Sequence, residues 1–118
     1  LDLKDWKMHT FYSGCCSEDQ VIVWFWEFME MIPNKERQLL LLFATGLAVP
    51  PIGGFSQMKS FGGEKMPFTI MLLPIKEDLP TAATCFNMLR LPAYSKRDVL
   101  NQKLLTAIRF GSQGFSFA

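Results

Sequence analysis

Residues 79–94 read Leu79-Pro80-Thr81-Ala82-Ala83-Thr84-Cys85-Phe86-Asn87-Met88-Leu89-Arg90-Leu91-Pro92-Ala93-Tyr94, and this stretch decides the fold. Its second half, Cys85 to Leu91, predicts a strand that follows a loop of small side chains. A second strand is predicted at Phe68–Leu73, between Pro67 and Pro74. These two short runs are too few for a large sheet, so helices must supply most of the core.

Three helical segments are predicted around these strands. Ser17 and Gln20 match a capping box before an apolar run over residues 18–32, which has Val21, Trp24, Phe25, Phe28 and Ile32 on one side and Val23, Trp26 and Met29 on the other. A helix that is apolar on both sides is buried or contacts a partner. The sequence places a second helix at residues 35–45, after Pro33-Asn34 and before Gly46, with three inward side chains, Leu39, Leu42 and Phe43.

The last helix begins at the capping box of Ser95 and ends at Gly111, leaving a tail over residues 112–118. Its apolar face comprises Val99, Leu100, Leu104, Ala107 and Ile108. Residues 48–65 are rich in proline and glycine and predict loops with one short strand. The predicted fold class is therefore α+β, a small β-sheet packed with helices.

Composition restricts the class of protein. The chain has 118 residues, 49% of them hydrophobic, which suits one folded domain. A net charge of +1 gives no excess positive field for nucleic acid, and no apolar run reaches the roughly 20 residues of a membrane span. The start has no signal-peptide pattern and no initiator Met, which suggests a fragment. Three cysteines without paired or zinc-binding spacing predict reduced thiols, and so a cytoplasmic protein without a metal or cofactor.

Cys85 is the candidate nucleophile, because the small residues before it would leave its sulfur accessible. The competing interpretation is a buried structural cysteine, since Phe86 and Leu89 are close by and cysteine is often buried. Cys15 and Cys16, next to Gly14, are more typical of a hinge than of a reactive site.

A cysteine hydrolase would need a histidine as base, and His9 is the chain's one histidine. A lone histidine in a polar segment is usually a solvated surface residue, so hydrolysis is the weaker hypothesis. Exchange of one thioester for another needs no strong base, because a thiolate attacks and a thiolate leaves, as in thiol–disulfide exchange. An accessible Cys85 would suffice for such a transfer.

The stretch Leu79–Tyr94 resembles the active-site signature of the HECT ubiquitin ligases, LPxxxTCFNxLxLPxY. Further matches follow in family order along the chain: Val21-Ile22 with Trp24-Phe25-Trp26, Leu40-Leu41 to Gly46, Gly53-Gly54-Phe55, and Lys103-Leu104-Leu105 with Ala107-Ile108. The resemblance covers essentially the whole chain, and the ankyrin-repeat HECT ligase is the branch nearest by eye. It implies that residues 1–14 end the larger N-lobe and form the hinge, and that residues 15–118 are the catalytic C-lobe.

The resemblance also implies the chemistry. A ubiquitin-conjugating enzyme docks on the N-lobe and passes ubiquitin to Cys85 as a thioester, and Cys85 passes it to a lysine of a protein substrate. By the same match Thr84 supports the thioester, and Phe115, four residues from the end of the family pattern, orders the lobes for transfer. The ubiquitin tail is expected to lie extended beside a C-lobe strand. For this chain we expect a location in the cytoplasm and also in the nucleus.

Two departures limit what carries over. Many members have a histidine two residues before the cysteine, where this chain has Ala83, and many end in an acidic side chain, where it has Ala118. No residue is therefore assigned to deprotonating the acceptor lysine. The alternative from another class is a non-catalytic module that binds ubiquitin or another lobe through the apolar residues Trp24, Phe28 and Phe115.

Overall fold

The computed structural model describes residues 1–74 and 77–116, with side chains as far as residue 111. It contains four helices and a four-stranded sheet, which confirms the predicted α+β class. The helices are α1 (Leu3–Met8), α2 (Gln20–Met31), α3 (Asn34–Thr45) and α4 (Arg97–Ser116). The strands are β1 (Phe11–Ser13), β2 (Thr69–Leu73), β3 (Thr81–Ala83) and β4 (Met88–Pro92).

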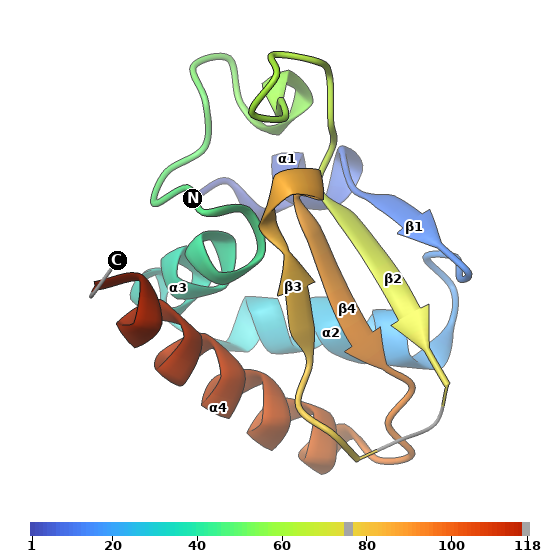
Figure 1. Cartoon of the computed structure of the whole chain (residues 1–118). Helices are drawn as coiled ribbons and strands as arrows, with labels where there is room; N and C mark the ends of the chain where they lie inside the picture. The colour runs from blue at the N-terminus through green and yellow to red at the C-terminus, as the bar shows by residue number, and fades with distance from the viewer. Residues whose placement is uncertain (75–76, 117–118) are drawn as a thin grey trace.

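The sheet has the strand order β1-β2-β4-β3. β1, β2 and β4 are parallel, with Tyr12 opposite Ile70 and Ile70 opposite Leu89, whereas β3 runs antiparallel to β4. The carboxyl ends of three strands therefore share one end of the sheet. The turn from β3 into β4 lies at the other end (Figure 1).

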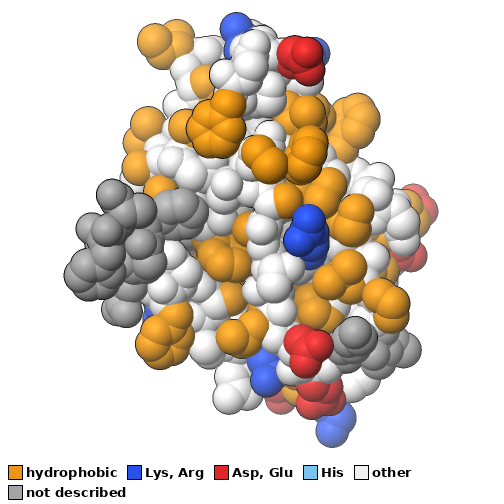
Figure 2. All heavy atoms as spheres, viewed as in Figure 1, with side chains coloured by type: hydrophobic (Ala, Val, Ile, Leu, Met, Phe, Trp, Pro, Cys, Tyr) orange, Lys and Arg blue, Asp and Glu red, His pale blue; other side chains and the backbone are white. Residues whose placement is uncertain are grey.

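The core lies between the sheet and the helices. In Figure 1, α2 crosses behind the sheet, and α3 and α4 lie beyond the β3 edge. Alternation along the strands sends Ile70, Leu89 and Leu91 into this core. The buried helical side chains that meet them include Ile22, Phe25, Met29, Leu40, Leu100, Leu104 and Ile108. The open face of the sheet carries apolar side chains as well (Figure 2).

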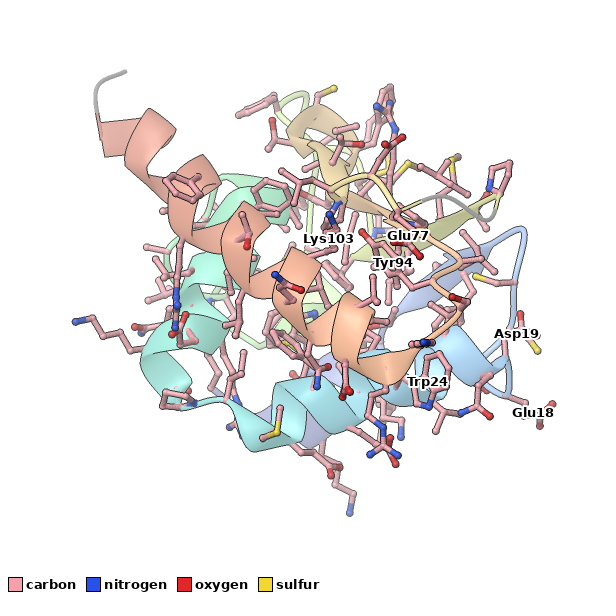
Figure 3. All side chains as sticks on the ribbon, turned by 90° about the horizontal axis from the view of Figure 1, so that it is seen from below. Glu18, Asp19, Trp24, Glu77, Tyr94 and Lys103 are labelled. Carbon is pink, nitrogen blue, oxygen red and sulfur yellow. The ribbon has the colours of Figure 1, made fainter. Side chains whose placement is uncertain are left out.

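The predicted α2 is confirmed, but its predicted cap is wrong. The helix begins at Gln20 with Asp19 as its N-cap, and Asp19 makes no side-chain bond to the helix. Its Oδ2 instead accepts a hydrogen bond of 2.9 Å from the amide of Cys16, in the turn before the helix. Figure 3 shows Glu18 and Asp19 at this end of α2. The Asp19 carboxylate thus stabilises the turn before the helix, and the predicted cap by the Ser17 hydroxyl is not formed within the described residues.

Two further predictions about helices need correction. In α3 the fully buried residues are Leu40, Leu41 and Ala44, whereas Leu39, Leu42 and Phe43 are only partly buried. A run of four leucines is apolar on every side, so its spacing does not indicate the inward face. α4 continues past Gly111 to Ser116, so no separate tail begins at residue 112. Gly111 lies against the ring of Phe43 and does not end the helix.

The segment before α2 contains two elements that no sequence pattern predicted. Asp2 caps α1 through a hydrogen bond from the amide of Asp5 to its Oδ1 at 3.1 Å, and β1 joins the edge of the sheet at β2. Trp6 of α1 is fully buried. The boundary between residues 1–14 and 15–118 stays a prediction, but α1 and β1 share the core of the rest of the chain.

The segment between α3 and β2 lies over the end of the sheet where β3 turns into β4 (Figure 1). It holds one 3₁₀ turn, η1 (Phe55–Gln57), and within the described residues its one extended pairing is the bridge between Lys59 and Lys65. The predicted short strand is therefore absent from this described segment. We call residues 58–66 the 58–66 hairpin, because its two arms exchange hydrogen bonds from Met66 to Met58 at 2.9 Å and from Ser60 to Glu64 at 2.8 Å.

Candidate active site

Cys85 lies in the turn between β3 and β4. The sequence predicted that a strand begins at this residue, but Thr84–Phe86 form a 3₁₀ turn, η2, and β4 begins at Met88. The structure thus corrects the strand boundary and shows the missed strand β3 before the turn. The Cys85 side chain is exposed, so the interpretation as a buried structural cysteine is wrong.

Thr84 precedes the thiol as the first residue of η2. Its carbonyl accepts a hydrogen bond of 3.2 Å from the amide of Asn87, which closes the turn. Within the described residues its hydroxyl makes no hydrogen bond. A threonine hydroxyl in that state is free to donate to an oxygen that gains charge beside the neighbouring sulfur.

Two hollows open beside Thr84. The first, of about 390 Å³, lies against β3 and is lined by Phe43, Pro80, Thr81, Ala82, Thr84 and Gly111; we call it the β3 hollow. The second, of about 160 Å³, lies under the 58–66 hairpin and is lined by Thr45, Leu47, Lys59, Ser60, Phe61, Thr84 and Asn87; we call it the hairpin hollow. The turn that carries Cys85 therefore borders two hollows through Thr84, although Cys85 itself lines neither.

Asn87 ends the turn in an unusual conformation. Its φ is 51° and its ψ is 41°, in the left-handed region, and the residue is 3% exposed. Its side-chain amide donates to the carbonyl of Lys59 at 3.2 Å and to that of Met66 at 2.8 Å. The sequence motif includes Asn87, but nothing in residue spacing indicated a tie to the 58–66 hairpin.

His9 is not brought to Cys85. It caps the end of α1, where its Nδ1 lies 3.1 Å from Oδ1 of Asp5. The adjoining strand β1 is separated from β4 by β2, so Phe11 and Met88 lie two strand spacings apart, roughly 10 Å. His9 lines neither the β3 hollow nor the hairpin hollow. The geometry gives the cysteine hydrolase hypothesis no base.

The other two cysteines lie at the opposite end of the sheet, after the carboxyl end of β1. Cys15 is partly buried, and its sulfur contacts the carbonyls of Ser13 at 3.6 Å and Ile70 at 3.7 Å. Burial raises the pKa of the Cys15 thiol above its ordinary value. Cys16 is exposed, like Cys85. Exposure alone therefore does not distinguish a reactive thiol in this chain.

The remaining predicted residues lie near the end of the chain and at the end of β3. Phe115 falls within α4, but its side chain lies outside the described residues, as does Ala118. Ala83 is the last residue of β3 and directly precedes η2. In the described ranges, 1–74 and 77–116, no three His, Cys, Asp or Glu side chains are grouped to hold a metal ion. The same part of the chain contains no helix that is both long and apolar enough to cross a membrane.

The chain is similar to known proteins over its whole length. A family model described as HECT-domain (ubiquitin-transferase) matches residues 1–118. The chain is 44% identical over 120 residues to the E3 ubiquitin-protein ligase HACE1 of Homo sapiens and 43% identical to that of Danio rerio, with 100% of this chain and 13% of each relative covered. It is 42% identical over 108 residues to the E3 ubiquitin-protein ligase pub3 of Schizosaccharomyces pombe, with 92% of this chain and 14% of that relative covered. The chain thus spans 13–14% of the length of these relatives.

Proposed function

This chain belongs to the HECT-domain (ubiquitin-transferase) family, and we propose that it is the catalytic C-lobe of a ubiquitin ligase, with Cys85 as the residue that carries ubiquitin. The observation that carries the proposal is the exposed thiol of Cys85 on a closed turn, directly after Thr84, which lines two hollows. A conjugating enzyme, docked on a lobe outside these 118 residues, would supply the ubiquitin. The acceptors would be lysines of protein substrates in the cytoplasm and nucleus.

The reaction would take place in two steps at one sulfur. The Cys85 thiolate attacks the thioester carbon at the ubiquitin C-terminus, a C–S bond to Cys85 forms, and the conjugating enzyme's cysteine leaves as a thiolate. A substrate lysine amine then attacks the same carbon, a C–N bond forms, and the C–S bond to Cys85 breaks. The amine loses a proton, and the departing Cys85 thiolate takes one up.

Thr84 is proposed to assist both steps. In each attack the carbonyl oxygen gains negative charge, and a donor fixed beside it lowers the barrier. The Thr84 hydroxyl has no partner within the described residues and belongs to the residue directly before the sulfur. Removing one such donor typically costs about 100- to 1000-fold in rate. Thr84→Val, which keeps the shape of the side chain, would remove this donor.

The β3 hollow offers a place for the ubiquitin tail. β3 is an edge strand, since β4 is its one neighbour in the sheet, and the hollow lies between β3, Phe43 of α3 and Gly111 of α4. An extended chain could pair with the free edge of such a strand. A tail bound there would reach Thr84, and its last carbonyl would meet Cys85. The edge of β3 that has no strand partner within the described residues, with the hollow beside it, thus supports the expectation of strand addition.

Ubiquitin with an electrophile in place of its terminal carboxyl tests the assignment of the nucleophile. We expect the 118-residue chain to form one covalent adduct, the Cys16→Ala variant to form it at the same rate, and the Cys85→Ala variant to form none. Cys16 is the matched control because its side chain is also exposed. An adduct that persists in Cys85→Ala, or that disappears in Cys16→Ala, would overturn the proposal.

Phe115 is tested at the second step, in a ligase that contains both lobes. Phe115→Ala is expected to slow transfer to lysine roughly tenfold through loss of orientation, and to leave formation of the Cys85 thioester nearly unchanged. Single-turnover assays separate the two rates. An equal loss at both steps would reject a role for Phe115 in ordering the lobes.

A further inference from the structure

Asn87 combines a left-handed backbone conformation with a buried polar side chain. Among the described residues it is the one non-glycine residue with a positive φ, a conformation that costs energy for most side chains and that asparagine tolerates better than most. It is also one of few buried polar residues. A backbone in the left-handed region and a polar side chain buried away from water both cost energy. They persist only where the surrounding contacts hold the residue in place.

The contacts of the side chain are with one segment. Its amide group has two N–H donors, and both are used, one by the carbonyl of Lys59 and one by that of Met66. Carbonyls only accept hydrogen bonds, so the orientation of the amide follows from its partners. Lys59 and Met66 lie on opposite arms of the 58–66 hairpin. A single side chain therefore joins both arms to the cysteine turn.

The backbone of Asn87 joins two more segments. Its amide donates to the carbonyl of Thr84 and closes η2, and its carbonyl accepts a hydrogen bond of 2.9 Å from the amide of Thr69 at the start of β2. The cysteine turn, the hairpin and the sheet thus meet at this one residue. The hairpin hollow lies at this junction, with Thr84 and Asn87 on one side and Lys59, Ser60 and Phe61 on the other.

The hairpin has few other contacts that hold it against the cysteine turn within the described residues. Phe61 at its tip is 86% exposed, and Met58 is the one hairpin residue that belongs to the buried core within the described chain. Its distance from Cys85 therefore depends on specific hydrogen bonds more than on packing.

We propose that Asn87 is a positioning residue for thioester formation, one that fixes the 58–66 hairpin against the Cys85 turn. The fixed hairpin forms a wall beside Thr84 and limits the directions from which a ubiquitin tail reaches the sulfur. The inference rests on the proposed function of Cys85. It assigns Asn87 no contact with reacting atoms; its effect passes through the turn and the hairpin.

Substitutions at Asn87 separate backbone conformation from hydrogen bonding. Asn87→Gly keeps the positive φ without strain but removes both donors, and Asn87→Asp keeps the shape and also removes them. In a Cys15→Ala/Cys16→Ala background, Cys85 is the one thiol. We expect both variants to react roughly 10- to 100-fold more slowly with the ubiquitin electrophile. Their reaction with iodoacetamide, which needs only an exposed thiol, should stay within about twofold.

Three results of this experiment would overturn the inference. If Asn87→Gly reacts with the ubiquitin electrophile as fast as the parent, the hydrogen bonds do not position the site. If both reagents slow equally, the residue has a structural role alone. If the parent itself forms no adduct at Cys85, the proposed function fails, and the positioning role fails with it. The parent reaction therefore distinguishes the two failures.

A second pair of variants decides the question if substitutions at Asn87 prevent folding. Gly63 in the hairpin and Gly14 after β1 both have positive φ, 84° and 73°, and alanine at either would meet no close neighbour. Both changes impose the same backbone strain, but only Gly63→Ala imposes it on the hairpin. We expect Gly63→Ala to slow the ubiquitin electrophile a few-fold and Gly14→Ala to leave it unchanged. Equal rates for the two variants would overturn the proposal.

Discussion

The two ends of the sheet each carry an exposed cysteine, and only one of them has the surroundings of a reactive site. Cys16 follows β1 in the turn before α2, where its amide donates to the carboxylate of Asp19 at 2.9 Å and its carbonyl accepts from the Asp19 amide at 3.1 Å. Cys85 follows β3 in a closed turn, with hollows on two sides and Asn87 tying the turn to the 58–66 hairpin. The structure around a thiol, and not its exposure, therefore identifies the candidate nucleophile.

Three ionisable groups at the Cys16 end of the sheet, Tyr12, Cys15 and Tyr94, are partly or fully buried. At the Cys16 end, burial raises the pKa of Tyr12 and of Tyr94, as it does that of Cys15. Tyr94 donates a hydrogen bond of 2.5 Å to the carbonyl of Asp78. Burial thus favours the neutral form of these three groups. Such an environment favours structure over thiol chemistry, because the reactive form of a cysteine is the thiolate.

The largest expected effect comes from removing support at the Cys85 end. Trp6 stacks on Phe55 with ring centroids 4.8 Å apart and meets Phe68 edge to face at 5.3 Å. Trp6→Ala should lower the free energy of unfolding by about 3–5 kcal/mol, because it leaves a large cavity between α1 and the segment before β2. Urea unfolding followed by fluorescence measures the loss.

Trp24→Ala is the matched control for this change, since Trp24 lies partly exposed on α2. It should cost about 1 kcal/mol. If the two substitutions destabilise the chain equally, α1 does not anchor the Cys85 end, and the view that residues 1–14 share its core is wrong.

The sequence predicted the long elements and missed the short ones. Helical spacing indicated α2, α3 and α4, because each runs for at least 12 residues. α1 has six residues and β1 has three, too few for a periodic pattern. β1 exists because β2 supplies partners, beginning with the hydrogen bond from the amide of Phe11 to the carbonyl of Phe68 at 2.8 Å. Such pairing depends on residues distant in the sequence.

In the candidate site, too, the sequence predicted the features that depend on adjacent residues and missed the contacts between distant ones. The motif around Cys85 pointed to the nucleophile and to Thr84, since both are adjacent in the sequence. The role of Asn87 depends on carbonyls 28 and 21 residues away, at Lys59 and Met66. No local pattern shows these partners. The end of α4 was misplaced for a related reason: Gly111 looks like a helix stop, but its missing side chain makes room for Phe43.

A smaller effect is expected where α3 meets α4 at the β3 hollow. A Cβ at Gly111 would lie within 2.7 Å of two atoms of the Phe43 ring, so the ring must move. Gly111→Ala should destabilise the chain by about 1–2 kcal/mol, even though alanine favours a helix by about 1 kcal/mol over glycine. In a Phe43→Ala background the same change should be neutral or stabilising. Urea unfolding of the four chains forms a double-mutant cycle, and no coupling between the positions would show that they do not touch.

The smallest expected effect lies at the opposite end of the sheet, in the pH dependence of Cys15. Burial favours its neutral thiol, so its pKa is raised in the folded chain. Its contribution to stability is therefore present below the pKa of the unfolded thiol and is lost as the pH rises through the folded one. In a Cys16→Ala/Cys85→Ala background, alkylation of Cys15 by iodoacetamide should reach half its maximal rate at a higher pH in buffer than in urea. Coinciding profiles would show that folding does not raise the pKa of Cys15, and the contrast between the two ends of the sheet would then rest on the surroundings of Cys85 alone.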